Sequence, residues 1–387
     1  MRIKALTGIC VALLSVCFLG SCEKPGTELS ELMIIQCIGL DYENGNYTAT
    51  VEILNNEQSG SPGGTSNSDQ KTKIYNAKAP TVASALRKLT TKSGNVPLFA
   101  HNRVIVLGES VTKKDLLDVI DFFCRNYDSR PTQLICTAKK TSAEKVIRAK
   151  LLSDSVKGEI LENLLEESAK QSLVPRVRVI DAMNYLKETT SCLCIPAVKV
   201  QKNGENENYE LDGCAVIGYD DKLSAYIDEK STEGICFLND EIKKGIINAT
   251  LPNGKKATMS INKGRTKCDV AIKDGKLCYT VKIEVSCDLE QVEEAEYFNK
   301  DNGVIETFQR AGEAALREKA INTMDVLRKT KGSDCIRFGK RLRFKDNKLY
   351  HQLENNWAEH FSQAEITINT EVIIRRIGEE TFHSKKH

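Results

Sequence analysis

A large net charge is absent from this 387-residue sequence, which carries 55 Lys and Arg residues against 53 Asp and Glu residues. A balanced chain has no overall field that would draw it to nucleic acid or to anionic lipid. The sequence beyond residue 22 also lacks an apolar run long enough to span a bilayer. Any attachment to a membrane is therefore expected to come from the N-terminal end of the chain.

Motifs for common enzymatic chemistry are missing as well. The sequence contains no Gly-x-Ser-x-Gly, no Walker loop and no His-Glu-x-x-His. Only five histidines occur, and His383 and His387 lie in the polar tail. A lone His101 beside an apolar run is more typical of a hydrogen-bonded structural residue than of a catalytic base. These absences favour a scaffold or binding protein over an enzyme, with no catalytic residue, no cofactor and no metal site.

The 14 cysteines include no Cys-x-x-Cys pair, and no histidine lies at metal-ligand spacing from them. Cys192 and Cys194 are the only close pair, and small strand or loop residues are the favoured interpretation of both. Cys37, Cys136 and Cys287 lie where a small buried hydrophobic residue would serve. Eleven cysteines follow residue 22, and an odd number cannot pair completely within one chain.

The first 22 residues have the parts of a secretory signal peptide. Arg2 and Lys4 give a positive start, residues 5–18 are mostly apolar, and small residues follow. The ending Leu19-Gly20-Ser21-Cys22 resembles a bacterial lipobox, in which the signal is cut before a cysteine that carries diacylglycerol. We predict a signal peptide over residues 1–21 and lipidation of Cys22. The alternatives are an ordinary signal with a chance cysteine and an uncleaved anchor.

The first half of the mature chain alternates between strand and helix patterns. Residues 33–41 and 47–53 are joined by an Asn-Gly turn, which predicts a β-hairpin. Residues 104–107 predict a fully buried strand. Thr112-x-x-Asp115 then predicts a capping box that opens a helix, and another strand follows. Strand, helix and strand at this spacing predict a βαβ unit with a parallel strand pair.

The pattern changes beyond residue 200. Helices are predicted over residues 142–171, in two pieces, and over 179–186. The polar, turn-rich residues 201–208 then predict a domain boundary. Short strands are expected after it, at residues 211–217, 223–227 and 235–238.

The last third begins with a strand whose apolar residues alternate strictly over residues 280–289, which predicts one buried and one wet face. A long amphipathic helix is predicted around residues 305–327. A second helix, over residues 349–361, carries the only tryptophan, Trp357, and residues 365–376 predict a closing strand.

These patterns predict the α+β class, with three α+β domains that contain mixed and antiparallel sheets after a cleaved lipoprotein signal peptide. The expected divisions are the signal at residues 1–21, an N-terminal α+β domain at 22–204, a small middle β-rich domain at 205–260, and a C-terminal α+β domain at 261–380. The last domain is expected to combine the long helix with an antiparallel sheet.

Several short motifs follow one another in order along the chain. They are the lipobox at Cys22, Ile38-Gly39-Leu40-Asp41, Pro97-Leu98-Phe99-x-His101-x-Arg103-Val104-Ile105-Val106-Leu107-Gly108-Glu109, Leu211-x-Gly213-x-Ala215-Val216-Ile217, Glu233-Gly234, Asp334-x-x-x-Phe338-Gly339, Trp357 and Arg376-x-Gly378. In this order and spacing the chain resembles the C-subunit lipoproteins of bacterial spore germinant receptors, the GerAC type. The family often has Trp-Asp after the lipidated cysteine, where this chain has Glu23-Lys24, so any contact made by that tryptophan is in doubt.

The resemblance implies three α+β domains, no known catalytic activity and work within a complex in the spore inner membrane. The implied partners are the two other receptor subunits, a membrane protein with a large soluble part and a multi-spanning transporter-like protein. With them the chain would act in nutrient-triggered germination. The alternative is a substrate-binding lipoprotein of a transporter, a class that usually has two similar α/β lobes around a cleft. An exported hydrolase is disfavoured by the missing nucleophile motifs.

Overall fold

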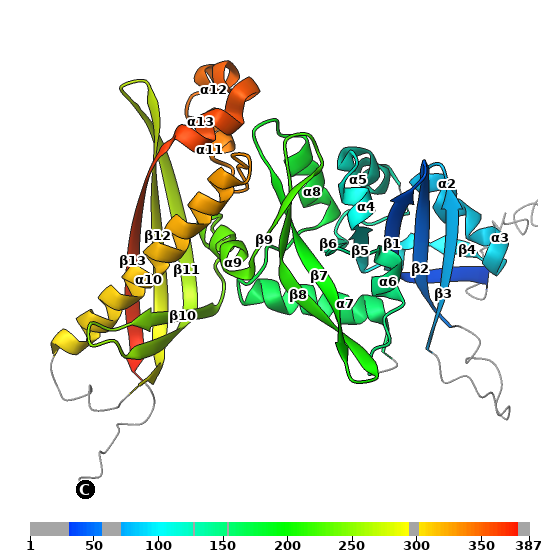
Figure 1. Ribbon diagram of the computed structural model, residues 1–387, viewed down its shortest axis with the longest axis horizontal. Helices are drawn as coiled ribbons and strands as arrows, with labels where there is room; N and C mark the ends of the chain where they lie inside the picture. Colours follow the sequence, from blue (N-terminus) through cyan, green and yellow to red (C-terminus); the bar gives the residue numbers. More distant parts are fainter. Residues whose placement is uncertain (1–30, 56–70, 127, 153–154, 294–301, 378–387) are drawn as a thin grey trace, which may run out of the picture.

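The computed structural model describes residues 31–55, 71–126, 128–152, 155–293 and 302–377. Two β-sheets lie along the long axis of the molecule, with helix α9 (Glu229–Leu238) between them (Figure 1). We call them the first sheet, built from residues 32–227, and the second sheet, built from residues 245–377. This mixture of helices and strands in two sheets confirms the predicted α+β class.

The first sheet has nine strands, with β4 paired only to the start of β1 and the others in the order β3-β2-β1-β5-β6-β7-β8-β9. Its strands are β1 (Leu32–Glu43), β2 (Asn46–Leu54), β3 (Thr72–Ala79), β4 (Val96–Leu98), β5 (Val104–Gly108), β6 (Leu134–Ala138), β7 (Leu193–Asn203), β8 (Asn206–Ile217) and β9 (Leu223–Ile227). The predicted hairpin is confirmed as β1 and β2, which are antiparallel around a turn with positive φ at Asn44 and Gly45. The predicted βαβ unit is confirmed by the parallel pair β5 and β6.

Helices cover both faces of the centre of the first sheet. On one face lie α2 (Val82–Lys88), α5 (Leu116–Arg125) and α8 (Val179–Leu186), whose buried side chains share one core with Ile105 and Leu107 of β5. Helix α2 lies over β2 and β3. On the other lie α6 (Ala143–Ile147) and α7 (Lys157–Lys170), which pack around Val104 and Val106. Strand β5 is therefore buried at every position, as its continuous apolar sequence predicts.

The capping box predicted at Thr112 and Asp115 is wrong. Thr112 ends the short helix α4 (Glu109–Thr112), and its hydroxyl donates to the Glu109 carbonyl. Asp115 itself is the N-cap of α5, where its side chain accepts from the backbone N–H of Leu117. The acidic side chain thus caps the helix that follows it directly, because an Asp at the N-cap position satisfies an unpaired N–H without help from a residue three positions earlier.

The predicted domain boundary near residue 204 falls at the turn between β7 and β8. These two strands pair from Asn203 and Asn206 back to Leu193 and Ile217, so the first sheet continues across the polar turn. The turn is polar because a tight hairpin needs residues that tolerate positive φ, as Gly204 does here. The division of the chain into three domains stays a prediction.

The strand predicted at residues 235–238 is wrong, because these residues form the last turn of α9. Asp228 caps this helix by accepting from the N–H of Ser231. All four apolar residues are buried, since α9 packs against β8 on one side and against α10 (Asn302–Lys329) on the other. A short helix buried all round has no apolar stripe, so its pattern matches that of a buried strand.

The second sheet has the order β10-β11-β12-β13, with strands β10 (Gly245–Thr250), β11 (Lys256–Lys273), β12 (Lys276–Val292) and β13 (Glu365–Ile377). Strand β12 alternates between buried and more exposed residues from Leu277 to Leu289, which confirms the predicted half-buried strand. The predicted long helix is also confirmed, as α10. The antiparallel sheet expected here is only partly correct, because β12 and β13 are parallel across the long helical crossover between them.

The second helix predicted over residues 349–361 is divided into three pieces. These are α12 (Asn347–Leu353), the 3-10 turn η5 (Glu354–Asn356) and α13 (Trp357–Gln363), after α11 (Phe338–Lys345). Asn355 and Asn356 are poor helix formers because their side chains compete for backbone hydrogen bonds. The break turns Trp357 into the core, where it is 2% exposed.

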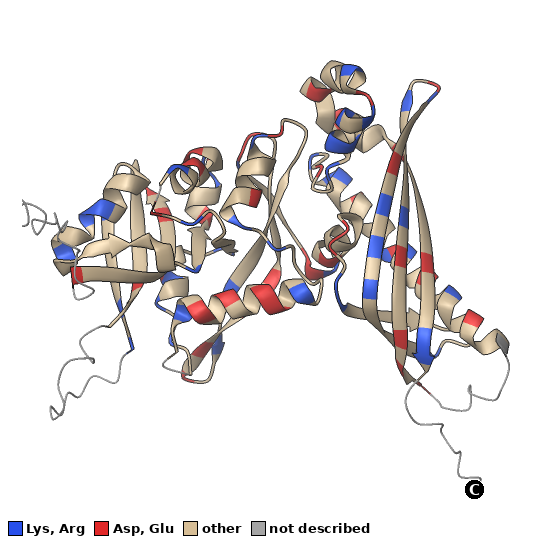
Figure 2. Ribbon diagram, turned by 180° about the vertical axis from the view of Figure 1, so that it is seen from behind, with Lys and Arg blue, Asp and Glu red and all other residues tan. Residues whose placement is uncertain are grey.

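One hydrophobic core runs from the first sheet into the second. It contains Cys192, just before β7, and Cys214 and Val216 of β8, together with Phe237 of α9 and Tyr279 of β12. Positive and negative side chains are interspersed over both sheets and their helices (Figure 2). No helix in the part of the chain that the structure describes has the length and hydropathy needed to cross a bilayer.

Candidate functional site

The predicted lipidation site, Cys22, lies outside the described residues and stays a prediction. The cysteines within the described ranges are all free, among them Cys192 and Cys194. Burial raises the pKa of both Cys136 and Cys287 to about 12, so these thiols stay protonated and unreactive near neutral pH. The same part of the chain has no group of three or more His, Cys, Asp or Glu side chains that could hold a metal ion.

The motif around residue 103 ties β5 to its neighbours. The Arg103 Nε donates to Oε1 of Gln36 on β1 over 3.1 Å, and its Nη1 pairs with Glu162 on α7. His101 lies in the 3-10 turn η3 (Phe99–His101) and is exposed, so the expectation that it is a hydrogen-bonded structural residue is wrong. The turn carries it away from the sheet before β5 begins, whereas Arg103 keeps its structural role.

Asp41 explains the motif Ile38-Gly39-Leu40-Asp41 and the glycine at position 108 in the motif around Arg103. Its carboxylate accepts from the backbone N–H groups of Ala143 and Glu144, each over 2.9 Å, at the start of α6. A Cβ added to Gly108 would lie 1.9 Å from Oδ1 of Asp41, so only glycine leaves room for this contact. A helix N-terminus attracts a carboxylate because its first N–H groups have no partner within the helix.

Glu52 performs the same task for α7 and was not found from the sequence. It is fully buried, and its carboxylate accepts from the N–H groups of Lys157 and Gly158 over 2.9 and 2.8 Å. A glutamate within a strand has no signature for a helix cap that lies about 100 residues further along the chain. Only the sheet and the helix together show its role.

A second buried carboxylate, Asp334, explains the C-terminal motif Asp334-x-x-x-Phe338-Gly339, because it binds the other motif residues. It is fully buried and accepts from the N–H groups of Ile336, Phe338 and Gly339 over 3.2, 3.0 and 2.8 Å. The indole Nε1 of Trp357 donates to it over 3.0 Å. Burial raises the pKa of Asp334 to about 6, against the effect of these four donors, which favour the charged form.

The backbone of Asp334 links this motif to the first sheet. Its carbonyl accepts from the N–H of Cys192 at the start of β7, over 3.0 Å. Its N–H donates to the hydroxyl of Tyr219 in the turn after β8, also over 3.0 Å. A Cβ on Gly339 would lie 2.3 Å from Oγ1 of Thr190, so glycine is needed there as well. The Asp334 cluster therefore joins the C-terminal helices to the first sheet.

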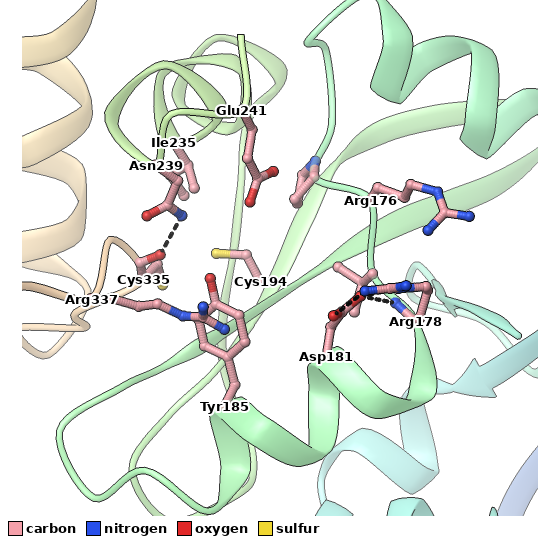
Figure 3. Close-up of a pocket in the computed structure, with 12 residues that line it drawn as sticks. Arg176, Arg178, Asp181, Tyr185, Cys194, Ile235, Asn239, Glu241, Cys335 and Arg337 are labelled. Atoms are coloured by element: carbon pink, nitrogen blue, oxygen red, sulfur yellow. Dashed lines mark hydrogen bonds and ion pairs between the residues drawn. The ribbon is translucent and has the colours of Figure 1, made fainter. Parts of the chain in front are cut away.

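A cavity of about 240 Å³ lies beside this cluster, between α8, α9 and the residues before α11 (Figure 3). Glu241 points into it from the segment after α9, and the guanidinium of Arg337 stacks on the ring of Tyr185, 3.5 Å from the ring centroid. Burial raises the pKa of Glu241 to about 7, while Arg337 opposes this rise. No motif predicts this cavity, since its walls come from residues 175–185, 194, 235–241 and 335–337, which are separate along the chain.

The fold defines a class of two-sheet α+β protein in which buried carboxylates cap helices and join segments. The crystal structure of the GerBC protein has this fold: the two match with a TM-score of 0.58 and 20% identity, over 87% of this chain and 96% of that one. The model of the spore germination protein N-terminal domain matches residues 26–200, and that of the spore germination B3/GerAC-like C-terminal domain matches residues 212–378. The chain thus belongs to the GerAC family of spore germination proteins, as its motifs predicted.

Two proteins of Bacillus subtilis (strain 168) are similar over nearly their whole length. Spore germination protein KC is 26% identical, with 95% of this chain and 94% of that protein covered. The putative spore germination protein YfkR is 22% identical, with 95% and 96% covered. The similarity therefore extends across both sheets and is not limited to one of them.

Proposed function

We propose that this protein is a lipid-anchored, non-enzymatic subunit of a spore germinant receptor, which acts with two membrane subunits in nutrient-triggered germination. The observation that carries the proposal is the match to both family domains, over residues 26–200 and 212–378. The relatives of known name are spore germination proteins and are similar in full length, which supports the same role for the whole chain.

A structural role for the motif residues supports a subunit without chemistry of its own. Asp41 and Asp334 each hold backbone N–H groups at the start of a helix, which leaves their carboxylates without a free face for acid–base work. The absence of a side chain at Gly108 makes room for Asp41, and its absence at Gly339 makes room for Thr190. The motif residues stabilise the fold, and a subunit without chemistry of its own acts through the surface that its fold presents to its partners.

The membrane location rests on Cys22. The lipobox-like ending at residues 19–22 supports a diacylglycerol anchor, and two acyl chains hold a protein firmly on a bilayer. The proposed location is the spore inner membrane, where the two other subunits would lie.

The anchor is tested by the substitution Cys22→Ala. Metabolic labelling with a radioactive fatty acid should mark the native chain and fail to mark the variant, because the thiol is the acceptor. The variant should also leave the membrane fraction on washing with salt. Cys37→Ala is a matched control, since this buried thiol lies in β1 and cannot be an acceptor in the folded chain. Lipid label that persists in Cys22→Ala would contradict the anchor.

A further inference from the structure

The cavity between α8, α9 and the residues before α11 is lined by two charged side chains of opposite sign, Glu241 and Arg337, that have no hydrogen-bonded partner among the described residues. Neither the carboxylate of Glu241 nor the guanidinium of Arg337 forms an ion pair or hydrogen bond with any residue that the structure describes. Arg337 stacks on Tyr185, and this contact leaves the edge of the guanidinium, with its N–H groups, available (Figure 3). Both side chains are partly buried, and Arg337 acts on Glu241 only through space, by lowering its pKa. Partly buried charges without hydrogen-bonded partners are costly, so a small group that carries both charges would be stabilised by binding to the two side chains together.

The other charges of the cavity wall are already satisfied. Arg178 donates to both oxygens of Asp181, over 2.7 and 2.8 Å. Arg176 donates through Nε and Nη2 to Glu166, over 2.9 and 2.6 Å. Because these four side chains are already paired with one another, they are less available to bind a ligand. Glu241 and Arg337 are the groups that remain.

The backbone holds Arg337 in place. This residue has φ of 58°, a left-handed conformation that is uncommon for a side chain other than glycine or asparagine. The N–H groups of Ile336 and Phe338, on either side of it, both donate to Oδ1 of Asp334. The buried carboxylate thus fixes the direction in which Arg337 leaves the chain, and that direction is into the cavity.

The size and the remaining walls restrict what fits. A volume of about 240 Å³ lies below the roughly 300–1,000 Å³ of pockets for drug-sized ligands, so the occupant must be small. Ile235, Pro175 and Cys194 provide apolar surface. The amide of Asn239 is held by the carbonyl of Cys335 over 2.9 Å, which keeps this side of the cavity rigid.

We propose that this cavity binds a small zwitterion of the α-amino-acid class, with the carboxylate on Arg337 and the ammonium group on Glu241. A guanidinium binds a carboxylate through two parallel hydrogen bonds, and a carboxylate is the natural partner of an ammonium group. Such a ligand would contact α8, the end of α9 and the segment before α11 together. It would therefore fasten the C-terminal part of the molecule to the first sheet. Binding at this cavity would require neither the lipid anchor nor the other receptor subunits.

Calorimetric titration of the full-length chain in detergent tests the proposal. The probes are glycine, alanine, serine and valine, each compared with its N-acetyl form and its amide. At least one free amino acid should bind at a single site. Its N-acetyl form lacks the ammonium group and its amide lacks the carboxylate, so each should bind about tenfold or more weakly.

Variants locate the binding. Arg337→Gln and Glu241→Gln should each weaken binding about tenfold or more, because each removes one charge-assisted contact. Arg337→Lys keeps the charge but not the planar donor pair, so its affinity should lie between those of the native chain and Arg337→Gln. The control is Arg310→Gln, which removes an exposed arginine that pairs with Glu306 on α10, and it should bind as the native chain does.

Thermal melting without ligand shows which variants are folded. If Arg337→Gln fails to fold, the affinity of Glu241→Gln alone tests the proposal. This variant is expected to fold because a neutral amide is tolerated at this position. Absence of binding by all four amino acids would overturn the proposal. Equal binding of the N-acetyl forms, or unchanged binding by a folded Glu241→Gln, would overturn it as well.

Discussion

At the scale of the residue, single carboxylates hold this structure together, and two of the three, Glu52 and Asp334, are fully buried. Asp41, Glu52 and Asp334 each accept hydrogen bonds from at least two backbone N–H groups at the start of a helix. For Asp41 and Glu52 that helix lies about 100 residues further along the chain. Asp334 does most, because it also binds the only tryptophan and reaches β7 through its carbonyl.

We expect Asp334→Ala to destabilise the protein strongly. The substitution leaves the N–H groups of Phe338 and Gly339 and the indole of Trp357 buried without an acceptor. An unpaired buried donor costs about 1–3 kcal/mol, so the free energy of unfolding should fall by about 3 kcal/mol or more. Denaturant unfolding measures this loss. Asp325→Ala, at an exposed position of α10, should change stability by less than about 0.5 kcal/mol, and a similar small change for Asp334→Ala would refute its role.

Glu241 gives the stability a pH dependence of defined sign. A glutamate that titrates near 4.5 when unfolded has its pKa raised to about 7 in the fold, so between these values the folded state binds more protons. Stability from this group is complete below about pH 4.5 and is lost as the pH rises through about 7. The change is on the order of 2 kcal/mol, and Glu241→Gln should abolish it.

Unfolding by denaturant at several pH values, in the native chain and in Glu241→Gln, measures the difference. Asp221 and Asp334 also have pKa values raised to about 6, but both are present in the two proteins, so their contributions cancel. Parallel stability curves for the two proteins across pH 4.5 to 7 would show that Glu241 is not buried as the structure has it.

At the scale of the element, the spacing of apolar residues was sufficient to predict a strand or helix that has one solvent-exposed face. It was also sufficient for a strand whose residues are all apolar and buried. The hairpin of β1 and β2, strand β12 and helix α10 follow from it directly. It failed for the end of α9, which is buried all round. A local pattern does not show which surfaces later cover a segment.

The sites were harder to predict than the elements. Asp334 and Trp357 were visible as a motif, but their contact, and its link to Cys192, joins residues 23 and 142 positions apart. The cavity needs Tyr185, Glu241 and Arg337 from three segments, none of which has a motif for binding. Long-range packing decides such sites, and the sequence carries no local signal for it.

Substitution of Arg103 tests how much its contacts between β5, β1 and α7 contribute to stability. Its contacts to Gln36 and Glu162 connect β5 with β1 and α7, and its side chain is 39% exposed. We expect Arg103→Ala to lower stability by about 1 kcal/mol, since half-exposed pairs contribute little more. The exposed His101 is the matched control, and His101→Ala should leave the melting temperature unchanged. If Arg103→Ala melts normally but no longer purifies with the other receptor subunits, the residue serves docking and not the fold.

The whole molecule is an elongated body with two sheets, joined by the Asp334 cluster and a shared core, whose motif residues maintain shape. Its family membership and its shape both favour a protein that works through contact with partners. A substrate-binding lipoprotein would instead be expected to have two similar lobes around a cleft, whereas here a nine-stranded and a four-stranded sheet differ in topology.

The most direct test is affinity purification of the tagged full-length chain from spore inner membranes, followed by mass spectrometry of what comes with it. We predict that the two other receptor subunits, one with a large soluble part and one multi-spanning, co-purify in constant proportion. Spores that carry Asp334→Ala should lose this complex and the germination response, because the shape is lost. A native chain that purifies alone, or only with a transporter, would contradict the assignment as a receptor subunit.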